Sequence, residues 1–173
     1  MIQEIKDYFF FKRLNKEIDH GRKNLLLQEF SEVKNIGLVY DATDFVMIAE
    51  MRDLEIKLKN EGKNISVFAF INSGEKKYEP FLFSKKDLNW YGYPTKHQLF
   101  DFTVMDFDLV LGFFNGLNYP LNVIFAHSKS KLRLGINYKQ NPALFDIILG
   151  SDSNLSGKDI VNKLMNFITA IKT

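Results

Sequence analysis

Several polar side chains that could bind a ligand stand directly after short apolar segments. If those segments are parallel strands, the polar residues lie outside the carboxyl ends of the sheet, where open parallel sheets bind their ligands. Carboxylates also suit Mg²⁺, and Asp41 and Asp44 are close enough in sequence to share one ion. The candidate ligand-binding residues are Asp41, Thr43, Asp44, Asn72, Ser73 and Asn115.

A structural role is the simpler interpretation of the first three of these residues. Thr43 or Asp44 can serve as the N-cap of a helix predicted over residues 45–61, while Asp41 ends the strand before it. Helix caps are common and Mg²⁺ sites are rare. We therefore expect capping here, and no metal ion or other cofactor.

A second candidate is a group of basic side chains in a stretch without acidic residues. No Asp or Glu occurs over residues 109–145, and Lys129, Lys131 and Arg133 fall inside this stretch. Gathered on one face, these three would attract phosphate or another anion. The alternative, which we favour, is a solvated surface whose charge is balanced by nearby aspartates. Those aspartates are Asp106, Asp108 and Asp146.

Motifs of the common catalytic folds are missing from the sequence. No G-x-G-x-x-G fingerprint follows any predicted strand, and there is no G-x-S-x-G nucleophile motif. The absence of Cys excludes cysteine nucleophiles, thiolate metal sites and disulfides. The sequence therefore points to no reaction, and whether the protein is an enzyme stays open.

Short apolar runs alternate with amphipathic helices along most of the chain. Nearly continuous apolar strands are typical of a parallel sheet that is covered on both faces. The sequence predicts an α/β domain, a three-layer Rossmann-like or flavodoxin-like sandwich with a mainly parallel five-stranded sheet. Residues 81–83 could add a further short strand. The five strands are predicted at residues 36–41, 65–71, 107–113, 132–136 and 145–149.

The N-terminal residues 1–20 are predicted as an amphipathic helix in front of the α/β domain, which spans residues 21–173. We expect one apolar face to pack against the protein's own body or a second copy of the chain. A protein partner is another occupant. A membrane surface is a further one, which the acidic residues of the helix disfavour. The residues expected to face protein are Ile2, Ile5, Phe9 and Leu14.

Composition sets further limits on the protein. The chain has 173 residues, enough for one domain, and its 17 Phe predict an unusually aromatic core. A net charge of +2 argues against nucleic acid as a partner. No apolar run approaches the length of a membrane span, and the charged N-terminus does not resemble a signal peptide. We expect a cytoplasmic protein.

Four segments together resemble a family of short, uncharacterised α/β proteins of Bacteroidetes-type bacteria. The resemblance implies a bacterial protein and brings no known activity. The segments are GLVYDATD at 37–44, DLNWYG at 87–92, FDLVL at 107–111 and SKSKLRLG at 128–135. In addition, residues 107–111 followed by 132–135 resemble the N-terminal half of heptosyltransferase-like glycosyltransferases. In those enzymes a second Rossmann-like domain binds the nucleotide-sugar donor.

Two functions are consistent with these observations. We favour a non-catalytic interaction or scaffold protein that presents its basic-aromatic N-terminal helix, or the aromatic loop at residues 90–94, to a partner. The alternative is a small ligand-binding domain or enzyme that acts on a nucleotide or sugar phosphate at the strand ends. Fold alone cannot separate the two, because this architecture has many functions.

Overall fold

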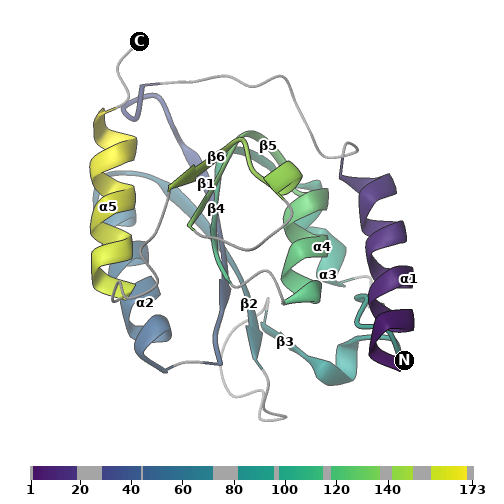
Figure 1. Ribbon diagram of the computed structural model, residues 1–173. Helices are drawn as coiled ribbons and strands as arrows, with labels where there is room; N and C mark the ends of the chain where they lie inside the picture. Colours follow the sequence, from purple (N-terminus) through teal and green to yellow (C-terminus); the bar gives the residue numbers. More distant parts are fainter. Residues whose placement is uncertain are drawn as a thin grey trace.

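The apolar runs form the strands of one sheet, and amphipathic segments between them form helices (Figure 1). The computed structural model describes residues 2–18, 29–43, 45–71, 82–95, 98–114, 118–136, 142–149 and 157–170. The strands are β1 (Asn35–Asp41), β2 (Asn64–Ile71), β3 (Leu82–Ser84), β4 (Asp106–Phe113), β5 (Lys129–Ile136) and β6 (Ile147–Leu149). The helices are α1 (Ile2–Glu17), α2 (Phe45–Asn60), α3 (Gln98–Val104), α4 (Tyr119–His127) and α5 (Gly157–Ala170), with short 3₁₀ turns η1 (Lys85–Asp87) and η2 (Pro142–Leu144).

The sheet has six strands in the order β3-β2-β1-β4-β5-β6, and each neighbouring pair is parallel. This confirms the α/β class and the parallel sheet, but the expected number of five strands is wrong. The sixth strand is β3, whose three residues pair with the end of β2. The sequence analysis named residues 81–83 as a candidate for it but left them out of the five, since so short a segment carries little pattern. The strand order matches the Rossmann arrangement rather than the flavodoxin one.

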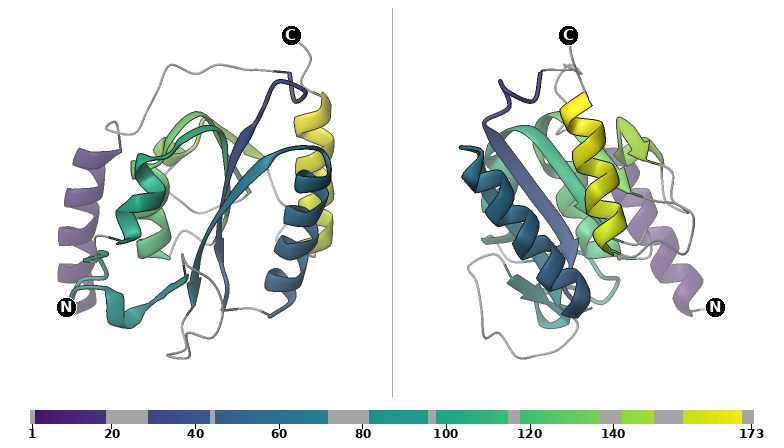
Figure 2. Two further views of the ribbon diagram at one scale, coloured as in Figure 1. Left: turned by 180° about the vertical axis from the view of Figure 1, so that it is seen from behind. Right: turned by 90° about the vertical axis from the view of Figure 1, so that its left-hand side faces the viewer.

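Helices cover both faces of the sheet (Figures 1 and 2). The crossover through α2 and the crossover through α4 run in opposite directions from the centre of the sheet. Since both are right-handed, the two helices lie on opposite faces. Helix α5 packs beside α2, and α3 packs beside α4. Helix α1 lies outside α4 and forms an additional outer layer on that side.

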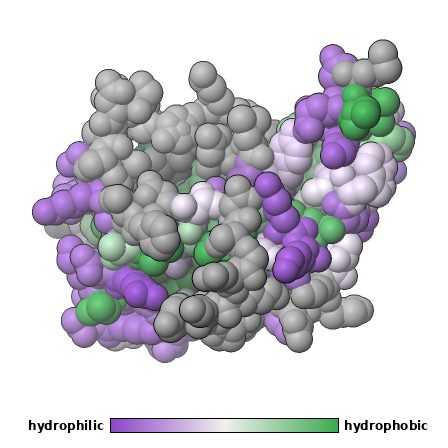
Figure 3. Space-filling model, turned by 90° about the horizontal axis from the view of Figure 1, so that it is seen from below, coloured by the Kyte–Doolittle hydropathy of each residue, from purple (hydrophilic) through white to green (hydrophobic). Residues whose placement is uncertain are grey.

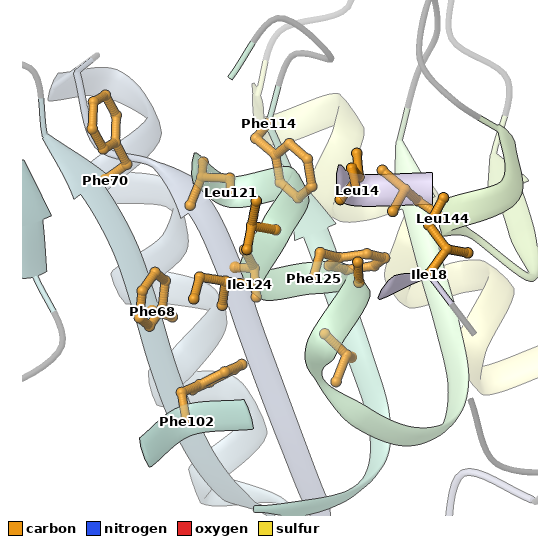
Figure 4. Close-up of a cluster of buried hydrophobic side chains, with 14 of the residues drawn as sticks. Leu14, Ile18, Phe68, Phe70, Phe102, Phe114, Leu121, Ile124, Phe125 and Leu144 are labelled. Atoms are coloured by element: carbon orange, nitrogen blue, oxygen red, sulfur yellow. The ribbon is translucent and has the colours of Figure 1, made fainter. Parts of the chain in front are cut away.

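The core beneath α1, α3 and α4 is built from aromatic rings (Figure 4). Gly112 of β4 and Gly135 of β5 are register partners, and neither has a Cβ atom that projects from the face of the sheet. The ring of Phe145 lies where a Cβ on Gly135 would project, and the ring of Phe125 does the same at Gly112. The glycines therefore let these flat rings pack directly on the backbone.

Helix α1 packs on the protein's own body through only part of the predicted face. Leu14 is buried as expected, whereas Ile2, Ile5 and Phe9 are exposed in the single chain, so their contact with a second copy or another partner stays a prediction. The buried residues follow a series of three- and four-residue steps along the whole helix. This series is Asp7, Phe10, Leu14 and Ile18, the first of them half-buried.

The physical reason lies in how the two series end. The series that starts at Ile2 and includes Ile5 and Phe9 continues with Lys12 and Lys16, whose charges would be costly to bury. The buried series is apolar from Phe10 onwards. Its Leu14 and Ile18 reach the aromatic core beside Leu144 (Figure 4).

Candidate functional site

The Asp41 carboxylate joins the end of β1 to the start of α4. Its Oδ1 accepts hydrogen bonds from the backbone N–H of Thr43 at 3.0 Å and from the Thr43 hydroxyl at 2.7 Å. Its Oδ2 accepts one from the Asn118 Nδ2 at 2.7 Å. Asn118 is the N-cap of α4, where its Oδ1 accepts a bond from the N–H of Leu121. These groups lie between β1 and β4, where the strand order reverses and where sheets of this kind bind ligands.

Asn118 is the member of this group that the sequence analysis missed. The signal was present, because Asn directly before Tyr119 and Pro120 is a typical helix start. Thr43 is exposed and Asp41 is half-buried. The other predicted ligand residues, Asp44, Asn72, Ser73 and Asn115, lie outside the described residues. Their grouping with Asp41 stays a prediction, although the parallel pairing of β1 with β2 brings the ends of these strands together.

Tyr119, the first residue of α4, connects the same edge of the sheet to α1. Its hydroxyl donates a hydrogen bond to Asp7 Oδ1 at 2.7 Å, and its ring stacks on Phe10 with centroids 4.4 Å apart. Burial, together with the hydrogen bond to the Asp7 carboxylate and its charge, raises the pKa of Tyr119 to about 12. Tyr119 therefore stays protonated at physiological pH and acts as a donor that fixes α1.

The three predicted anion-binding residues occupy every second position at the start of β5, and their surroundings differ. Lys129 is exposed, while Lys131 forms an ion pair with Asp108 at 2.7 Å. Arg133 is buried, and its Nη2 donates to the carbonyl oxygens of Ala126 and Ser128 at the end of α4. A cation is favourable there because helix carbonyls carry partial negative charge. Lys129 and Lys131 also lie at the amino end of the sheet, opposite to the edge where ligands usually bind.

Asp108 has a structural position at that amino end. Its Oδ2 accepts bonds from the N–H groups of Lys34 and Asn35 at 2.9 and 3.0 Å, which fixes the start of β1. Burial by itself would raise the pKa of Asp108. The hydrogen bonds from Asn35, Lys131 and Lys34 outweigh it and hold the pKa below its ordinary value.

A group of apolar side chains on α1 and in the loop after η1 faces the solvent. We call it the docking face, and it consists of Ile2, Ile5, Tyr8, Phe9 and Trp90. Ile2 is 74% exposed, Tyr8 60% and Trp90 61%. The Phe9 ring meets the Trp90 ring edge-on with centroids 6.0 Å apart, so the two segments form one surface. Seen from below, residues of high and of intermediate hydropathy lie among hydrophilic ones at the corner where α1 begins (Figure 3).

The loop that carries Trp90 is held in a defined shape. Asn89 Oδ1 accepts bonds from the N–H groups of Tyr91 and Tyr93, and Gly92 adopts a positive φ of 88° that other residues avoid. Arg13 ties the loop to α1, since its guanidinium lies 3.6 Å from the centre of the Tyr93 ring and donates to the Tyr91 hydroxyl. Trp90 is therefore presented to solvent by an ordered support.

Neither a metal centre nor a membrane span is found in the part of the chain that the structure describes. Within these residues, no three His, Asp or Glu side chains come together where they could hold a metal ion. None of the described helices combines the length and the apolar content needed to cross a bilayer.

Comparison with protein families identifies one match that covers nearly the whole chain. Residues 6–171 match the model described as "Family of unknown function (DUF6913)". A search of curated proteins found no match. The chain belongs to this family of unknown function.

Proposed function

We propose that this member of a family of unknown function is a non-catalytic interaction protein that binds its partner through the docking face. The observation that carries the proposal is the exposure of five large apolar side chains on one continuous surface. An aromatic side chain has a surface on the order of 150–250 Å². Three such side chains, about half exposed, together with Ile2 and Ile5 reach the few hundred Å² that mark interaction sites on soluble proteins.

The ordered support of Trp90 strengthens the proposal. Binding is weakened when a loop must lose its freedom, so a side chain held in place before contact contributes more affinity. Trp, Tyr and Arg also dominate the binding energy of measured interfaces. The docking face combines Trp90 and Tyr8 with the adjacent Arg13. The cytoplasmic location expected from the sequence is part of this proposal.

Site-specific photo-crosslinking in the native cell tests the docking face. We place a benzophenone amino acid at Phe9, and as a control at Ile56, a somewhat more exposed apolar residue of α2 on the far side of the sheet. Adducts that form at position 9 and not at position 56, and that the Ile5→Ser substitution diminishes, are expected. Equal adduct yields at the two positions would refute an interaction specific to this face.

A small ligand at the junction of β1 and α4 is a second candidate function. The Asp41–Asn118 hydrogen bond favours it, because polar groups from two elements converge where the strand order reverses. The ligand class remains the one expected from the sequence, a nucleotide or a sugar phosphate. The protein would either bind it or act on it as an enzyme. Thermal-shift screening with these compounds tests it, since a bound ligand raises the melting temperature with concentration. Asp41→Ala should abolish any such shift, and Asp53→Ala on α2 should preserve it.

A further inference from the structure

We infer that the surface that receives the docking face is an anionic lipid bilayer, on which α1 lies with its exposed side. This inference rests on the proposed function and names the partner that the same face would bind. Its main support is the order of residues along α1. Ile2, Ile5 and Phe9 are followed at three- and four-residue steps by Lys12 and Lys16, and all five are exposed. One side of the helix is thus apolar in its first half and basic in its second.

The acidic residues at the start of α1 do not interrupt this side. Asp7 belongs to the buried series, where its carboxylate accepts bonds from Tyr119 and Gln3. Glu4 and Glu17, the other two acidic residues of α1, also fall outside the exposed series of three- and four-residue steps. The objection that the sequence raised against a membrane therefore loses its force. A helix side with apolar and basic residues and no acidic ones fits an anionic bilayer, which attracts Lys and receives apolar side chains at its interface.

The aromatic residues of the docking face suit the same environment. Trp and Tyr accumulate at the boundary between lipid headgroups and acyl chains because their rings are apolar and their N–H or O–H groups remain hydrated. Trp90 and Tyr8 stand on either side of Phe9 in the chain of ring contacts. The Lys12 amine lies 5.4 Å from the centre of the Tyr8 ring, so a cation accompanies the apolar surface.

Electrostatics and shape disfavour a second copy of the chain on this face. Pairing two copies side by side would bring Lys12 and Lys16 of one close to those of the other, which is repulsive. Pairing them in opposite directions would place these lysines against Ile2, Ile5 and Phe9 of the partner, which is unfavourable because charges would be buried against apolar side chains. In addition, α1 is a single convex helix that forms the outermost layer (Figures 1 and 2). A soft planar surface can accommodate such a shape without a matching groove.

Trp90 provides a direct readout, since it is the one Trp of the sequence. The full-length protein is mixed with vesicles of phosphatidylcholine, or of phosphatidylcholine with about a third phosphatidylglycerol. Flotation measures binding, and Trp90 fluorescence measures transfer of the docking face to an apolar environment. We expect binding and a blue shift with the anionic vesicles alone, and both should weaken in about 0.5 M NaCl because salt screens the attraction.

Matched charge reversals test which surface binds. Lys12→Glu with Lys16→Glu should weaken binding by about twentyfold or more, because each Lys near an anionic surface adds about fivefold to the affinity. Lys57→Glu with Lys163→Glu makes the same change of charge at exposed positions on α2 and α5 and should bind almost as the parent does. Melting temperatures verify that both variants fold. Equal losses in the two variants would overturn the inference, as would binding that ignores lipid charge.

The result also separates this inference from the proposed function. Absence of vesicle binding, together with adducts at position 9 to a protein or to a second copy, overturns the lipid inference and leaves the docking face intact. Absence of both vesicle binding and position-specific adducts overturns the two together. Vesicle binding that Ile5→Ser weakens and Ile56→Ser leaves unchanged supports both.

Discussion

The Asp7 carboxylate accepts a hydrogen bond at 2.7 Å from the hydroxyl of Tyr119, 112 positions further along the chain. Through this bond and the stacking of Phe10 on the Tyr119 ring, α1 is fixed to the first turn of α4. The same turn is capped by Asn118, which also binds Asp41 at the end of β1. A continuous series of contacts therefore connects the helix that carries the docking face to the reversal point of the sheet.

Removing the Tyr119 hydroxyl should lower the free energy of unfolding in a pH-dependent way. Tyr119→Phe loses a hydrogen bond to a carboxylate, which stabilises by about 1.5 kcal/mol at neutral pH. Because folding raises the pKa of Tyr119 from its ordinary 10.0 to about 12, the contribution is complete below pH 10 and is lost as the pH rises towards 12. Urea unfolding of parent and variant across this range measures the difference.

The exposed Tyr8 provides the control for that experiment. Its hydroxyl has a weak contact with the Lys12 amine at 3.5 Å, so Tyr8→Phe should change stability very little at any of these pH values. A stability difference between the parent and Tyr119→Phe that stays constant from pH 9 to pH 12 would contradict the assigned role of the Asp7–Tyr119 bond.

The contribution of Asp108 to stability should depend on pH in the opposite way, since it is lost as the pH falls. Its folded-state pKa lies below the ordinary 3.8, so its contribution is present above about pH 4 and is lost as the pH falls below that value. Asp108→Asn should cost on the order of 1–3 kcal/mol at pH 7, since the N–H groups of Lys34 and Asn35 and the Lys131 amine lose an anionic partner. Asp53→Asn on the exposed side of α2 should cost almost nothing. If the two substitutions had equal effects in denaturant titrations at pH 7, the structural role of Asp108 would be wrong.

The sheet was predictable from sequence to the extent that its strands are buried on both faces. The segments 36–41 and 107–113 are almost continuously apolar because α2 covers one side and α4 the other, and both became strands within a residue of the expected bounds. Strand β5 was expected from residue 132 and starts at Lys129 instead. Its first three residues are polar, and one of them, Lys131, pairs with Asp108 on the neighbouring strand, a contact that no local pattern reveals.

The orientation of α1 and the Asp41–Asn118 contact could not be predicted for a similar reason. The lysines that end the exposed series of α1 are visible in the sequence, but the place of Asp7 in the buried series depends on Tyr119, which is remote in sequence. Asp41 and Asn118 are 77 positions apart and meet through the order of the strands. Sequence patterns indicate which residues are buried within an element, whereas contacts of this kind require the topology.

Filling the space above Gly135 should destabilise the core. Gly135→Ala places a methyl group where the Phe145 ring lies, and forcing extra volume into a packed core costs about 1–3 kcal/mol. The same substitution in a Phe145→Leu background should cost less, because the narrower side chain leaves room for the methyl group. A double-mutant cycle by denaturant unfolding measures this coupling. Additive effects of the two substitutions would show that the ring and the glycine do not depend on each other.

Phe9 and Phe10 are adjacent in sequence and should respond in opposite ways to truncation. Phe10 is fully buried and stacked on Tyr119, so Phe10→Ala should lower the free energy of unfolding by about 3–5 kcal/mol, the usual cost of deleting a core aromatic ring. Phe9 is 47% exposed on the docking face, so Phe9→Ala should cost less than about 1 kcal/mol. Deleting residues 1–18 should resemble Phe10→Ala, because it also removes the anchor on α4. Chemical unfolding gives both values, and vesicle binding gives the complementary readout, in which Phe9→Ala is the damaging change. If Phe9→Ala destabilised the fold as much as Phe10→Ala, the exposed series of α1 would be part of the core and unavailable to a partner.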